Sequence, residues 1–422
     1  MTSKLALNGG TPVRTCPWLT YDQGNVMIDD SDVKAAERAV RSQLLFRYDK
    51  RPFAETEVGQ FETSCADFFG TQFALATSSG TTALALALMG AGIGPGDLVA
   101  CPAFTFPATP SAIKLVGARM QLVEVDDNLN FDLAHLQDKI TPDLKAIVVV
   151  HMRGVASNIE ALVDFAQRNN VILIEDAVPV FGATYNGKML GTFGQVGAFS
   201  TQSDKALNTG EGGLVITDDR DIFERMCALA GTYEGRLGRH LSDDAGGPQL
   251  DERTLPILSW RMDEIRAAIG RNQLDKFSAR REAALTNYEL VTNAIDSIGG
   301  LNIRKSQANK DGIAGDSLIV RLPYLTADEV SLVAEALRAE GIAARSLGDP
   351  GQVNARCFWH WLFCFEGMTQ AQIKKLAPRS VTYLVTAIDI PLSPLMTDED
   401  RDDLFAALRK VLRVAVPLQT AA

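Results

Sequence analysis

A short apolar run that ends on two carboxylates constrains the fold of this chain more than any other feature. Residues 171–174 form a β-type run, and Glu175 and Asp176 follow it directly. A buried hydrophobic strand that stops on acid is typical of a parallel sheet, in which ligands bind at the carboxyl ends of the strands. A second apolar run, 196–199, leads to Lys205. The sequence therefore predicts two strands that each end near an ionisable side chain.

One aspartate and one lysine placed in this way suit the chemistry of pyridoxal 5′-phosphate (PLP). The lysine would form a Schiff base, and the carboxylate would keep the pyridine nitrogen protonated so that the ring can accept electrons. We therefore predict Lys205 and Asp176 as the catalytic residues. Hydroxyl, amide and backbone donors follow nearby at Ser200, Gln202 and 210–213.

The whole string around these residues is more specific than a lysine after a strand. Between residues 175 and 213 the chain reads EDAVPVFGATYNGKMLGTFG, then FSTQSDK, then GEGG. This string resembles the DegT/DnrJ/StrS family of fold type I PLP enzymes, which are mainly aminotransferases that act on keto sugars and cyclitols. The resemblance extends from Asn8 to Pro391.

A turn of small residues, TSSGTT at 77–82, lies between a predicted strand and a predicted helix. Free backbone N–H groups and the positive end of the helix dipole would make it an anion site. An ordinary helix cap uses the same residue types, so the pattern alone leaves both interpretations open. In the family the matching turn holds the cofactor phosphate, which by resemblance assigns Gly80, Thr81 and Thr82 to cofactor binding, with Ser200 and Gln202 beside them.

Two further cofactor contacts follow from the resemblance. The segment 102–109 resembles one whose aromatic side chain packs on the pyridine ring, and Phe106 is the candidate. The alternative is that Phe104 and Phe106 are core residues. Ser259 stands where the family has an asparagine that reaches the phosphate of the neighbouring subunit, which implies a homodimer with shared active sites. Serine is shorter than asparagine but can still donate.

Besides Ser259, the chain departs from the family pattern at two further places. It has HMRG at 151–154, where the family commonly has H-x-Y-G. We predict His151 and Arg153 as substrate residues, because an arginine there could bind a carboxylate bidentately; a solvent-facing arginine is the alternative. Pro179 stands where the family usually has Gln or His near the phenolic oxygen of the cofactor, and proline donates no hydrogen bond.

Strand-like and helix-like segments alternate from about residue 73 to 217, which favours an α/β fold with a parallel sheet flanked by helices. The resemblance implies a fold type I PLP enzyme, with a large domain around a mostly parallel sheet and a smaller α+β C-terminal domain. We predict an N-terminal arm at 1–30, the PLP-binding domain at 31–260, and a linking helix with the small domain at 261–422.

Composition restricts the partners. The net charge is −11 and no basic cluster occurs, so neither nucleic acid nor an anionic membrane is predicted as a partner. The N-terminus lacks an apolar h-region, and no run reaches the roughly 18 apolar residues of a membrane span, so we expect a cytoplasmic protein. The six cysteines form no Cys-x-x-Cys pair, and no metal site is predicted.

We predict a PLP-dependent aminotransferase that moves an amino group from glutamate or glutamine to a keto or aldehyde sugar-like acceptor, which could carry a carboxylate. The alternative that Pro179 leaves open is a PLP-dependent cyclase, eliminase or decarboxylase that acts on an amino acid in a natural-product pathway. A silent homologue that only binds PLP or a sugar is disfavoured, because Lys205 and Asp176 are both present. LFRY (45–48) and HMRG resemble most the subgroup that contains the 8-amino-3,8-dideoxy-manno-octulosonate aminotransferase.

Overall fold

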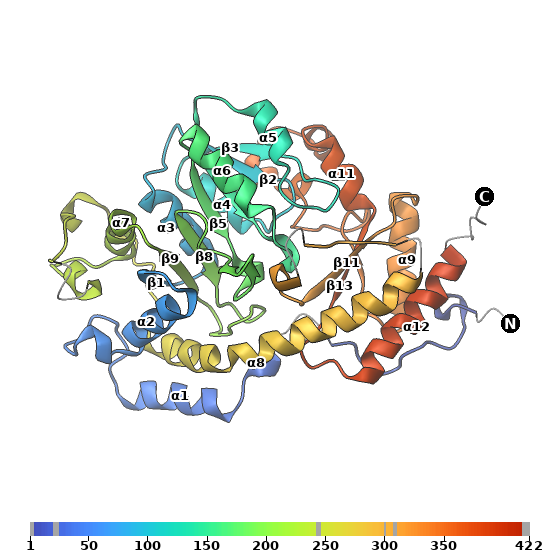
Figure 1. Cartoon of the computed structure of the whole chain (residues 1–422), viewed down its shortest axis with the longest axis horizontal. Helices are drawn as coiled ribbons and strands as arrows, with labels where there is room; N and C mark the ends of the chain where they lie inside the picture. The colour runs from blue at the N-terminus through green and yellow to red at the C-terminus, as the bar shows by residue number, and fades with distance from the viewer. Residues whose placement is uncertain (1–3, 20–24, 242–245, 299–300, 307–309, 416–422) are drawn as a thin grey trace.

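Two main sheets and one long helix that passes both organise the chain in its computed structural model, and a separate two-stranded sheet, β6-β7, adds to them. The structure describes residues 4–19, 25–241, 246–298, 301–306 and 310–415. Figure 1 shows the larger sheet with helices around it, the smaller sheet beside it, and helix α8 (Glu264–Ile295) running beneath both.

The larger sheet has seven strands in the order β1-β9-β8-β5-β4-β2-β3. Strand β9 runs antiparallel to both of its neighbours, and the other pairs in the sheet are parallel. The sheet is therefore mostly parallel, as predicted. Its strands are β1 (Phe73–Thr77), β2 (Leu98–Pro102), β3 (Arg119–Val123), β4 (Leu144–Val150), β5 (Ile172–Asp176), β8 (Val196–Ser200) and β9 (Gly213–Thr217).

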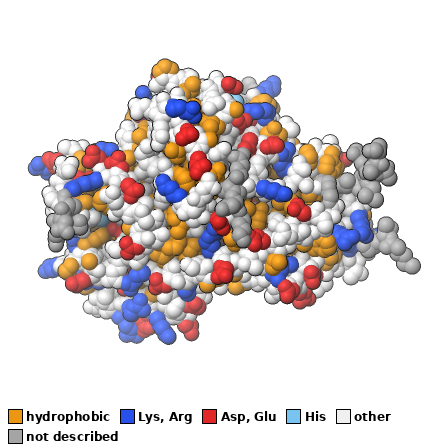
Figure 2. All heavy atoms as spheres, viewed as in Figure 1, with side chains coloured by type: hydrophobic (Ala, Val, Ile, Leu, Met, Phe, Trp, Pro, Cys, Tyr) orange, Lys and Arg blue, Asp and Glu red, His pale blue; other side chains and the backbone are white. Residues whose placement is uncertain are grey.

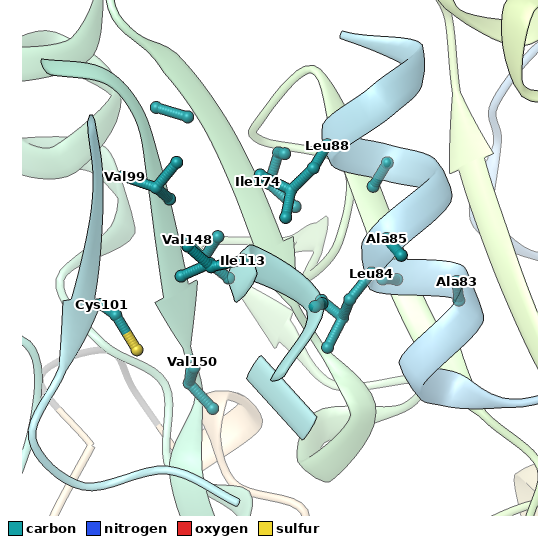
Figure 3. Close-up of a cluster of buried hydrophobic side chains, with 14 of the residues drawn as sticks. Ala83, Leu84, Ala85, Leu88, Val99, Cys101, Ile113, Val148, Val150 and Ile174 are labelled. Carbon is teal, nitrogen blue, oxygen red and sulfur yellow. The ribbon is translucent and has the colours of Figure 1, made fainter. Parts of the chain in front are cut away.

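Helices cover both faces of this sheet. Helices α3 (Gly80–Gly90), α4 (Ala108–Leu115) and α7 (Arg220–Ala230) contribute to one core. Helices α2 (Glu57–Phe69), α5 (Leu133–Lys139) and α6 (Ile159–Asn169), with the first turns of α8, contribute to the other. Figure 3 shows Leu84 and Leu88 of α3 beside Ile174 of β5. Because α3 is apolar on every side, it packs inside the fold rather than on its surface.

The smaller sheet is antiparallel, in the order β10-β11-β13-β12. Its strands are β10 (Asn302–Ile303), β11 (Ser317–Arg321), β12 (Arg345–Ser346) and β13 (Ala387–Pro391), and helices α9 (Ala327–Ala339) and α12 (Asp398–Ala415) lie with it. The N-terminal arm docks here too, because Glu340 accepts bonds from the amides of Ala6 and Val13, at 2.8 and 3.0 Å.

A segment late in the chain packs into the large-sheet core. Phe358, Trp359 and Trp361 are buried in the same cluster as β2 and β4, and an antiparallel bridge joins Phe104 to Cys357. The predicted boundary at 260/261 falls just before α8, yet residues beyond it complete the core of the larger part. The domain boundaries themselves stay a prediction.

The strands predicted at 171–174 and 196–199 are confirmed as β5 and β8, and the alternation of strands and helices between about residues 73 and 217 is confirmed as well, but some elements were not predicted. The additional ones include α4, α10 (Gln370–Lys374), α11 (Pro378–Val385), β6 (Thr184–Tyr185), β7 (Lys188–Met189) and β13. Helix α1 spans Asp30–Arg41. The short 3-10 helices are η1 (Ala6–Asn8), η2 (Asn25–Met27), η3 (Phe53–Glu55), η4 (Met152–Gly154), η5 (Val178–Val180), η6 (Leu237–His240), η8 (Glu252–Thr254), η9 (Asp296–Ile298), η10 (Lys310–Gly312), η11 (Phe358–His360) and η12 (Leu362–Cys364).

The surface carries both signs of charge. Figure 2 shows acidic and basic side chains interspersed over the displayed face. Within the described ranges, none of the helices has both the length and the apolar character that a membrane span needs.

Candidate active site

Asp176 and Lys205 meet at the carboxyl edge of the large sheet. Asp176 is the last residue of β5 and is 5% exposed, and Lys205 lies in the loop that follows β8. Strands β5 and β8 are parallel neighbours, which is why both residues reach the same edge. Each charge acts on the pKa of the other, lowering that of Asp176 and raising that of Lys205. The two residues predicted to be catalytic are thus brought together.

A threonine holds the Asp176 carboxylate. Burial raises the pKa of Asp176, and a hydrogen bond from Thr109 opposes this shift. Thr109 donates to Oδ2 of Asp176 at 2.8 Å. Since the only hydroxyl proton of Thr109 goes to Asp176, Thr105 donates the 2.9 Å bond between the two threonines. This short relay fixes the orientation of the carboxylate.

Lys205 lies in a desolvated place beside an aromatic ring. Burial lowers the pKa of Lys205; Asp204 raises it, and Arg356 and Arg153 lower it further. The Lys205 Nζ atom is 5.9 Å from the centroid of the Phe106 ring. Phe106 is 52% exposed, whereas Phe104 is 1% exposed. Phe104 is therefore a core residue, and Phe106 presents its ring at the site.

The turn before α3 combines a helix cap with backbone donors that can bind an anion. The Thr82 amide donates to Ser79 Oγ at 3.1 Å, and the Ser79 amide donates to Thr82 Oγ1 at 3.0 Å. Thr82 is thus used in capping the helix. Among the described residues, the amides of Gly80 and Thr81 make no hydrogen bond, so these two remain for an anion at the positive end of the helix.

Ser200 lies against the other side of the turn, and we call the turn residues 79–82 together with Ser200 the cradle. A Cβ atom added to Gly80 would lie 2.7 Å from Ser200 Cβ, so only glycine permits this close approach. Ser200 Oγ accepts a 3.3 Å bond from the Gln202 amide. Donors for a phosphate, a buried carboxylate, an exposed ring and a half-buried amine therefore converge, and the residues present fit PLP.

His151 is not placed as we expected. Its side chain is fully buried. The Ser157 amide donates to Nδ1 at 3.1 Å, so the proton is on Nε2, which faces Glu175 Oε2 at 3.2 Å. Both ring nitrogens are thus used inside the protein, and we no longer propose His151 as a substrate contact.

Glu175, next to Asp176, is a structural carboxylate. It accepts hydrogen bonds from the amides of Gly191, Phe193 and Gly194 at 2.7–2.8 Å. These bonds hold the loop that leads into β8, and therefore help to position Lys205.

Arg153 binds a carboxylate of the protein itself. It lies in η4 with φ of 55°. Its Nε atom is 2.9 Å from Oδ2 of Asp389 on β13, and its Nη2 atom donates to Oδ1 at 3.0 Å. Ser317 donates to the same carboxylate at 2.6 Å. Arg153 is near the site but joined to the smaller sheet.

Ser259 lies close to the phosphate turn of its own chain. The carbonyl of the next residue, Trp260, accepts a 3.1 Å bond from the Ser78 amide. Ser259 is exposed and has φ of 55°, a conformation that asparagine adopts more readily than serine. Its contact with a second subunit stays a prediction.

Sequence reasoning missed two residues here. Thr109 belongs to the segment FPAT that suggested Phe106, but its bond to Asp176 requires the fold. Arg356 lies in the aromatic cluster 356–361, and nothing in that pattern indicated that its charge acts on Lys205. Within the described ranges, no three His, Cys, Asp or Glu side chains gather as metal ligands would.

Comparisons with known proteins agree on one group. The sequence model of the DegT/DnrJ/EryC1/StrS aminotransferase family matches residues 28–409. The spore coat polysaccharide biosynthesis protein SpsC of Bacillus subtilis (strain 168) is 30% identical over 377 residues, which cover 85% of this chain and 90% of that protein. The L-glutamine:2-deoxy-scyllo-inosose aminotransferase of Streptomyces kanamyceticus is 33% identical over 346 residues, covering 80% and 79% of the two chains.

Solved structures show the same fold. The crystal structure of 3-amino-5-hydroxybenzoic acid synthase matches with a TM-score of 0.78 at 24% identity, and covers 96% of this chain and 100% of that one. An aminotransferase from Psychrobacter cryohalolentis matches with a TM-score of 0.78 at 23% identity, covering 95% and 100%.

Proposed function

Because this chain belongs to the DegT/DnrJ/EryC1/StrS aminotransferase family, we propose that it transfers an amino group from L-glutamine or L-glutamate to a keto or aldehyde group of a sugar-like acceptor. The enzyme class, a PLP-dependent aminotransferase, follows from the family. The observation that carries the proposal is the meeting of Lys205, buried Asp176 and the Phe106 ring at one sheet edge. Two relatives that use L-glutamine and act on an inosose support the donor and the acceptor class.

The residues of the site have distinct tasks. The amides of Gly80 and Thr81, with Ser200 and Gln202, would hold the phosphate; Phe106 would cover the ring. When bound, PLP supplies a ring that accepts the electrons left on the donor carbon. Lys205 moves the proton at that carbon, and burial favours the neutral amine needed to accept it. Asp176, oriented by Thr109, would accept the hydrogen bond of the ring nitrogen.

The test is a half-reaction without acceptor. Purified PLP-loaded protein is mixed with L-glutamine or L-glutamate, and release of the matching 2-oxo acid is followed together with the visible absorbance. We expect one equivalent of oxo acid per active site, and none from Lys205→Ala. Release of ammonia or carbon dioxide in place of the oxo acid would instead support the alternative function that Pro179 leaves open. That alternative is a PLP-dependent cyclase, eliminase or decarboxylase that acts on an amino acid.

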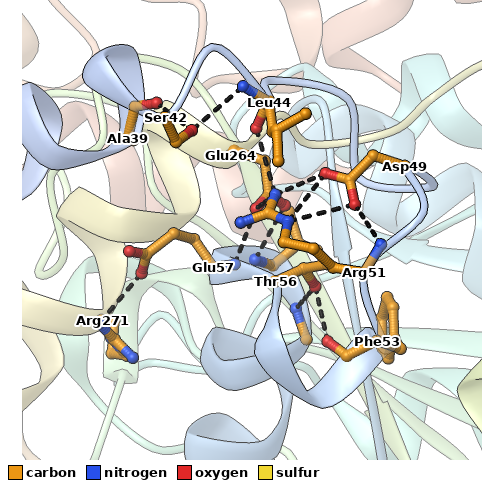
Figure 4. Close-up of polar contacts among 12 residues, drawn as sticks. Ala39, Ser42, Leu44, Asp49, Arg51, Phe53, Thr56, Glu57, Glu264 and Arg271 are labelled. Atoms are coloured by element: carbon orange, nitrogen blue, oxygen red, sulfur yellow. Dashed lines mark hydrogen bonds and ion pairs between the residues drawn. The ribbon is translucent and has the colours of Figure 1, made fainter.

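We further propose a homodimer, and an exposed apolar surface supports it. Leu44, Leu45 and Phe46 are 40–42% exposed. Two hydrogen bonds fix the backbone of this segment. The Glu264 amide donates to the Leu45 carbonyl at 3.2 Å, and the Arg51 guanidinium donates to the Leu44 carbonyl at 3.2 Å. Figure 4 shows Arg51 between Asp49 and Glu264. A rigid apolar surface of this kind is typical of a protein interface.

The same surface leads to Ser259. The guanidinium of Arg261 lies 5.3 Å from the Phe46 ring, so a copy of the chain that covers Phe46 would also lie near Ser259. Light scattering should give twice the chain mass for the native protein and the single mass for Phe46→Glu. A native mass of one chain would contradict the dimer.

A cytoplasmic location of the protein also stays our proposal.

A further inference from the structure

The loop that carries Lys205 spans residues 201–212 and connects two antiparallel neighbours, β8 and β9. Backbone hydrogen bonds close its base. The Thr209 amide donates to the Thr201 carbonyl at 2.8 Å, and the Thr201 amide donates to the Gly212 carbonyl at 2.9 Å. Because Lys205 lies between these closing residues, the base of the loop determines where its amine reaches.

Two buried threonine hydroxyls also hold this base together. Thr201 and Thr209 are 0% and 5% exposed. Thr209 Oγ1 lies 3.1 Å from the Thr201 carbonyl oxygen and 3.0 Å from the Glu211 carbonyl oxygen. Carbonyl oxygens only accept, so Thr209 donates to them, and Thr201 donates the 2.6 Å bond between the two hydroxyls. Helix α8 packs close behind, since a Cβ atom added to Gly270 would lie 3.2 Å from Thr209 Cγ2.

Asn208 links the loop to the N-terminal arm. It is 4% exposed, and its Oδ1 atom accepts a 2.8 Å bond from the Gly210 amide. Since a backbone amide can only donate, this bond fixes which end of the Asn208 side chain is the oxygen. Nδ2 of Asn208 therefore donates to Oδ1 of Asn25, at 3.2 Å. Asn25 begins η2, so the arm contacts the loop three residues after Lys205.

The arm is itself fixed on α8 next to this contact. Gln273 Nε2 and Lys276 Nζ each donate to the Met27 carbonyl at 3.2 Å. Lys276 also binds the Asp32 carboxylate at 2.7 Å, and the Asp32 side chain is 2% exposed. Asn25 is two residues from this fixed carbonyl, so it can hold Asn208 from outside the loop.

We propose that the side chains of Thr201, Asn208, Thr209 and Asn25, together called the loop anchor, position Lys205 for its reaction. The inference rests on the proposed function, in which Lys205 moves a proton at the donor carbon. That transfer needs the amine within hydrogen-bond reach of the proton, and a displacement of about 1 Å can lower such a rate roughly 100-fold. The anchor side chains act through the backbone of the loop, and the N-terminal arm thereby acts on the reaction.

The first experiment needs neither cofactor nor substrate. Amide hydrogen exchange of residues 202–208 in the apo protein is followed by mass spectrometry. Thr209→Val keeps the shape of the side chain and removes the donor, so these amides should exchange at least about fivefold faster. Thr209→Ser keeps the hydroxyl and should stay within about twofold of the native exchange rate.

Thr217→Val is the matched control. Thr217 is also buried, and its hydroxyl donates to the Gln195 carbonyl at 2.7 Å. It lies at the end of β9 that is remote from the loop. Its replacement therefore costs a buried hydrogen bond without loosening residues 202–208, whose exchange should stay native. Melting curves show that each variant is folded, and Asn208→Ala takes the place of Thr209→Val if that variant does not fold.

The half-reaction with L-glutamate then tests the positioning of the amine. In Thr209→Val the maximal rate should fall about 10-fold, while the glutamate concentration at half-maximal rate stays within about twofold, because no contact with the donor is changed. The slower proton transfer should also increase the ratio of rates for glutamate with hydrogen and with deuterium on the α-carbon. Thr209→Ser should recover most of the rate, and Thr217→Val should change neither the rate nor the ratio.

A double-mutant cycle tests the part of the arm. Asn25→Ala and Asn208→Ala remove the same hydrogen bond, so each should lower the maximal rate, and the double variant should be no slower than Asn208→Ala alone. A native rate in Asn25→Ala, or losses that add in the double variant, would overturn the role of the arm.

Two results would overturn the loop anchor as a whole. One is native exchange of residues 202–208 in Thr209→Val. The other is a loss of rate that Thr217→Val shows to the same extent. The exchange result does not depend on the reaction. Faster exchange in Thr209→Val, in a protein whose native form releases no oxo acid, would refute the aminotransferase function and leave the anchored loop standing.

Discussion

Thr109 donates a hydrogen bond of 2.8 Å to the buried carboxylate of Asp176. The bond links α4 to the end of β5 and gives the carboxylate a fixed orientation in a place with little solvent. Because the bond opposes the effect of burial on the pKa of Asp176, it favours the ionised form that a protonated ring nitrogen requires.

Replacing Thr109 tests this link. Thr109→Val keeps the shape of the side chain and removes the donor, so the pKa of Asp176 should rise and the half-reaction rate should fall about 10-fold. Stopped-flow absorbance with saturating L-glutamate measures the rate. Thr192→Val, which removes a hydroxyl bonded to the Met189 carbonyl, serves as the control and should change the rate less than twofold. Equal rates for the two variants would refute the role of Thr109.

The cradle beside α3 predicts an effect on cofactor affinity. In Gly80→Ala the new methyl group would lie 2.7 Å from Ser200 Cβ. Alanine is the better helix former, so a loss must come from the displaced Ser200. We expect the Kd for PLP, measured by fluorescence titration, to rise at least ~10-fold. Gly94→Ala is the matched control, because its methyl group would meet open space. Similar Kd values for both variants would argue against the cradle.

The half-buried amine of Lys205 should affect the stability of the apo protein. Burial lowers its folded-state pKa below the unfolded value of 10.5. At pH values below the pKa that Lys205 has in the folded protein, the native state carries a desolvated positive charge on this amine. As pH rises between the folded and unfolded values, the native state releases this proton first, so stability increases. Lys205→Met should therefore be more stable than the native protein at pH 7, and its advantage should shrink at pH 10. Urea midpoints at the two pH values test this, and an advantage that grows with pH would contradict it.

The Arg153–Asp389 pair should stabilise the contact between the two sheets. Both side chains are largely buried, at 12% and 3% exposed. Asp389→Asn leaves the arginine without a counter-charge and should lower the free energy of unfolding by about 3–5 kcal/mol. The double variant Arg153→Met/Asp389→Asn removes both charges and should lose much less than the sum of the two single losses. Urea denaturation of the native protein, Arg153→Met, Asp389→Asn and the double variant completes the cycle, and additive losses would show that the pair is not coupled.

Much of this architecture can be predicted from the sequence, because alternating apolar runs and turns predict strands and helices locally. Helix α4 was missed because Pro107 and Pro110 suggest a loop; proline is tolerated there, since the first helical turn needs no amide donors. In the site, Lys205 and Asp176 follow from their motif. The partner of Arg153 does not, because Asp389 is 236 residues away and any of many carboxylates could have met it.

His151 shows a different limit. A polar residue at the end of a strand predicts a functional edge, and Asp176 meets that prediction. His151 directly follows the neighbouring strand β4, but its ring turns to Glu175 and is buried. The sequence pattern places a residue at an edge without saying which way its side chain points.

The position of Phe358 and Trp361 has a consequence for synthesis of the chain on the ribosome. Both rings fill the core that β2 and β4 begin to build more than two hundred residues earlier. N-terminal segments usually fold first as they emerge. Here part of the apolar surface of the large sheet stays uncovered until residues 358–361 have left the exit tunnel, so a nascent chain of this protein most needs a chaperone in the interval before that segment emerges.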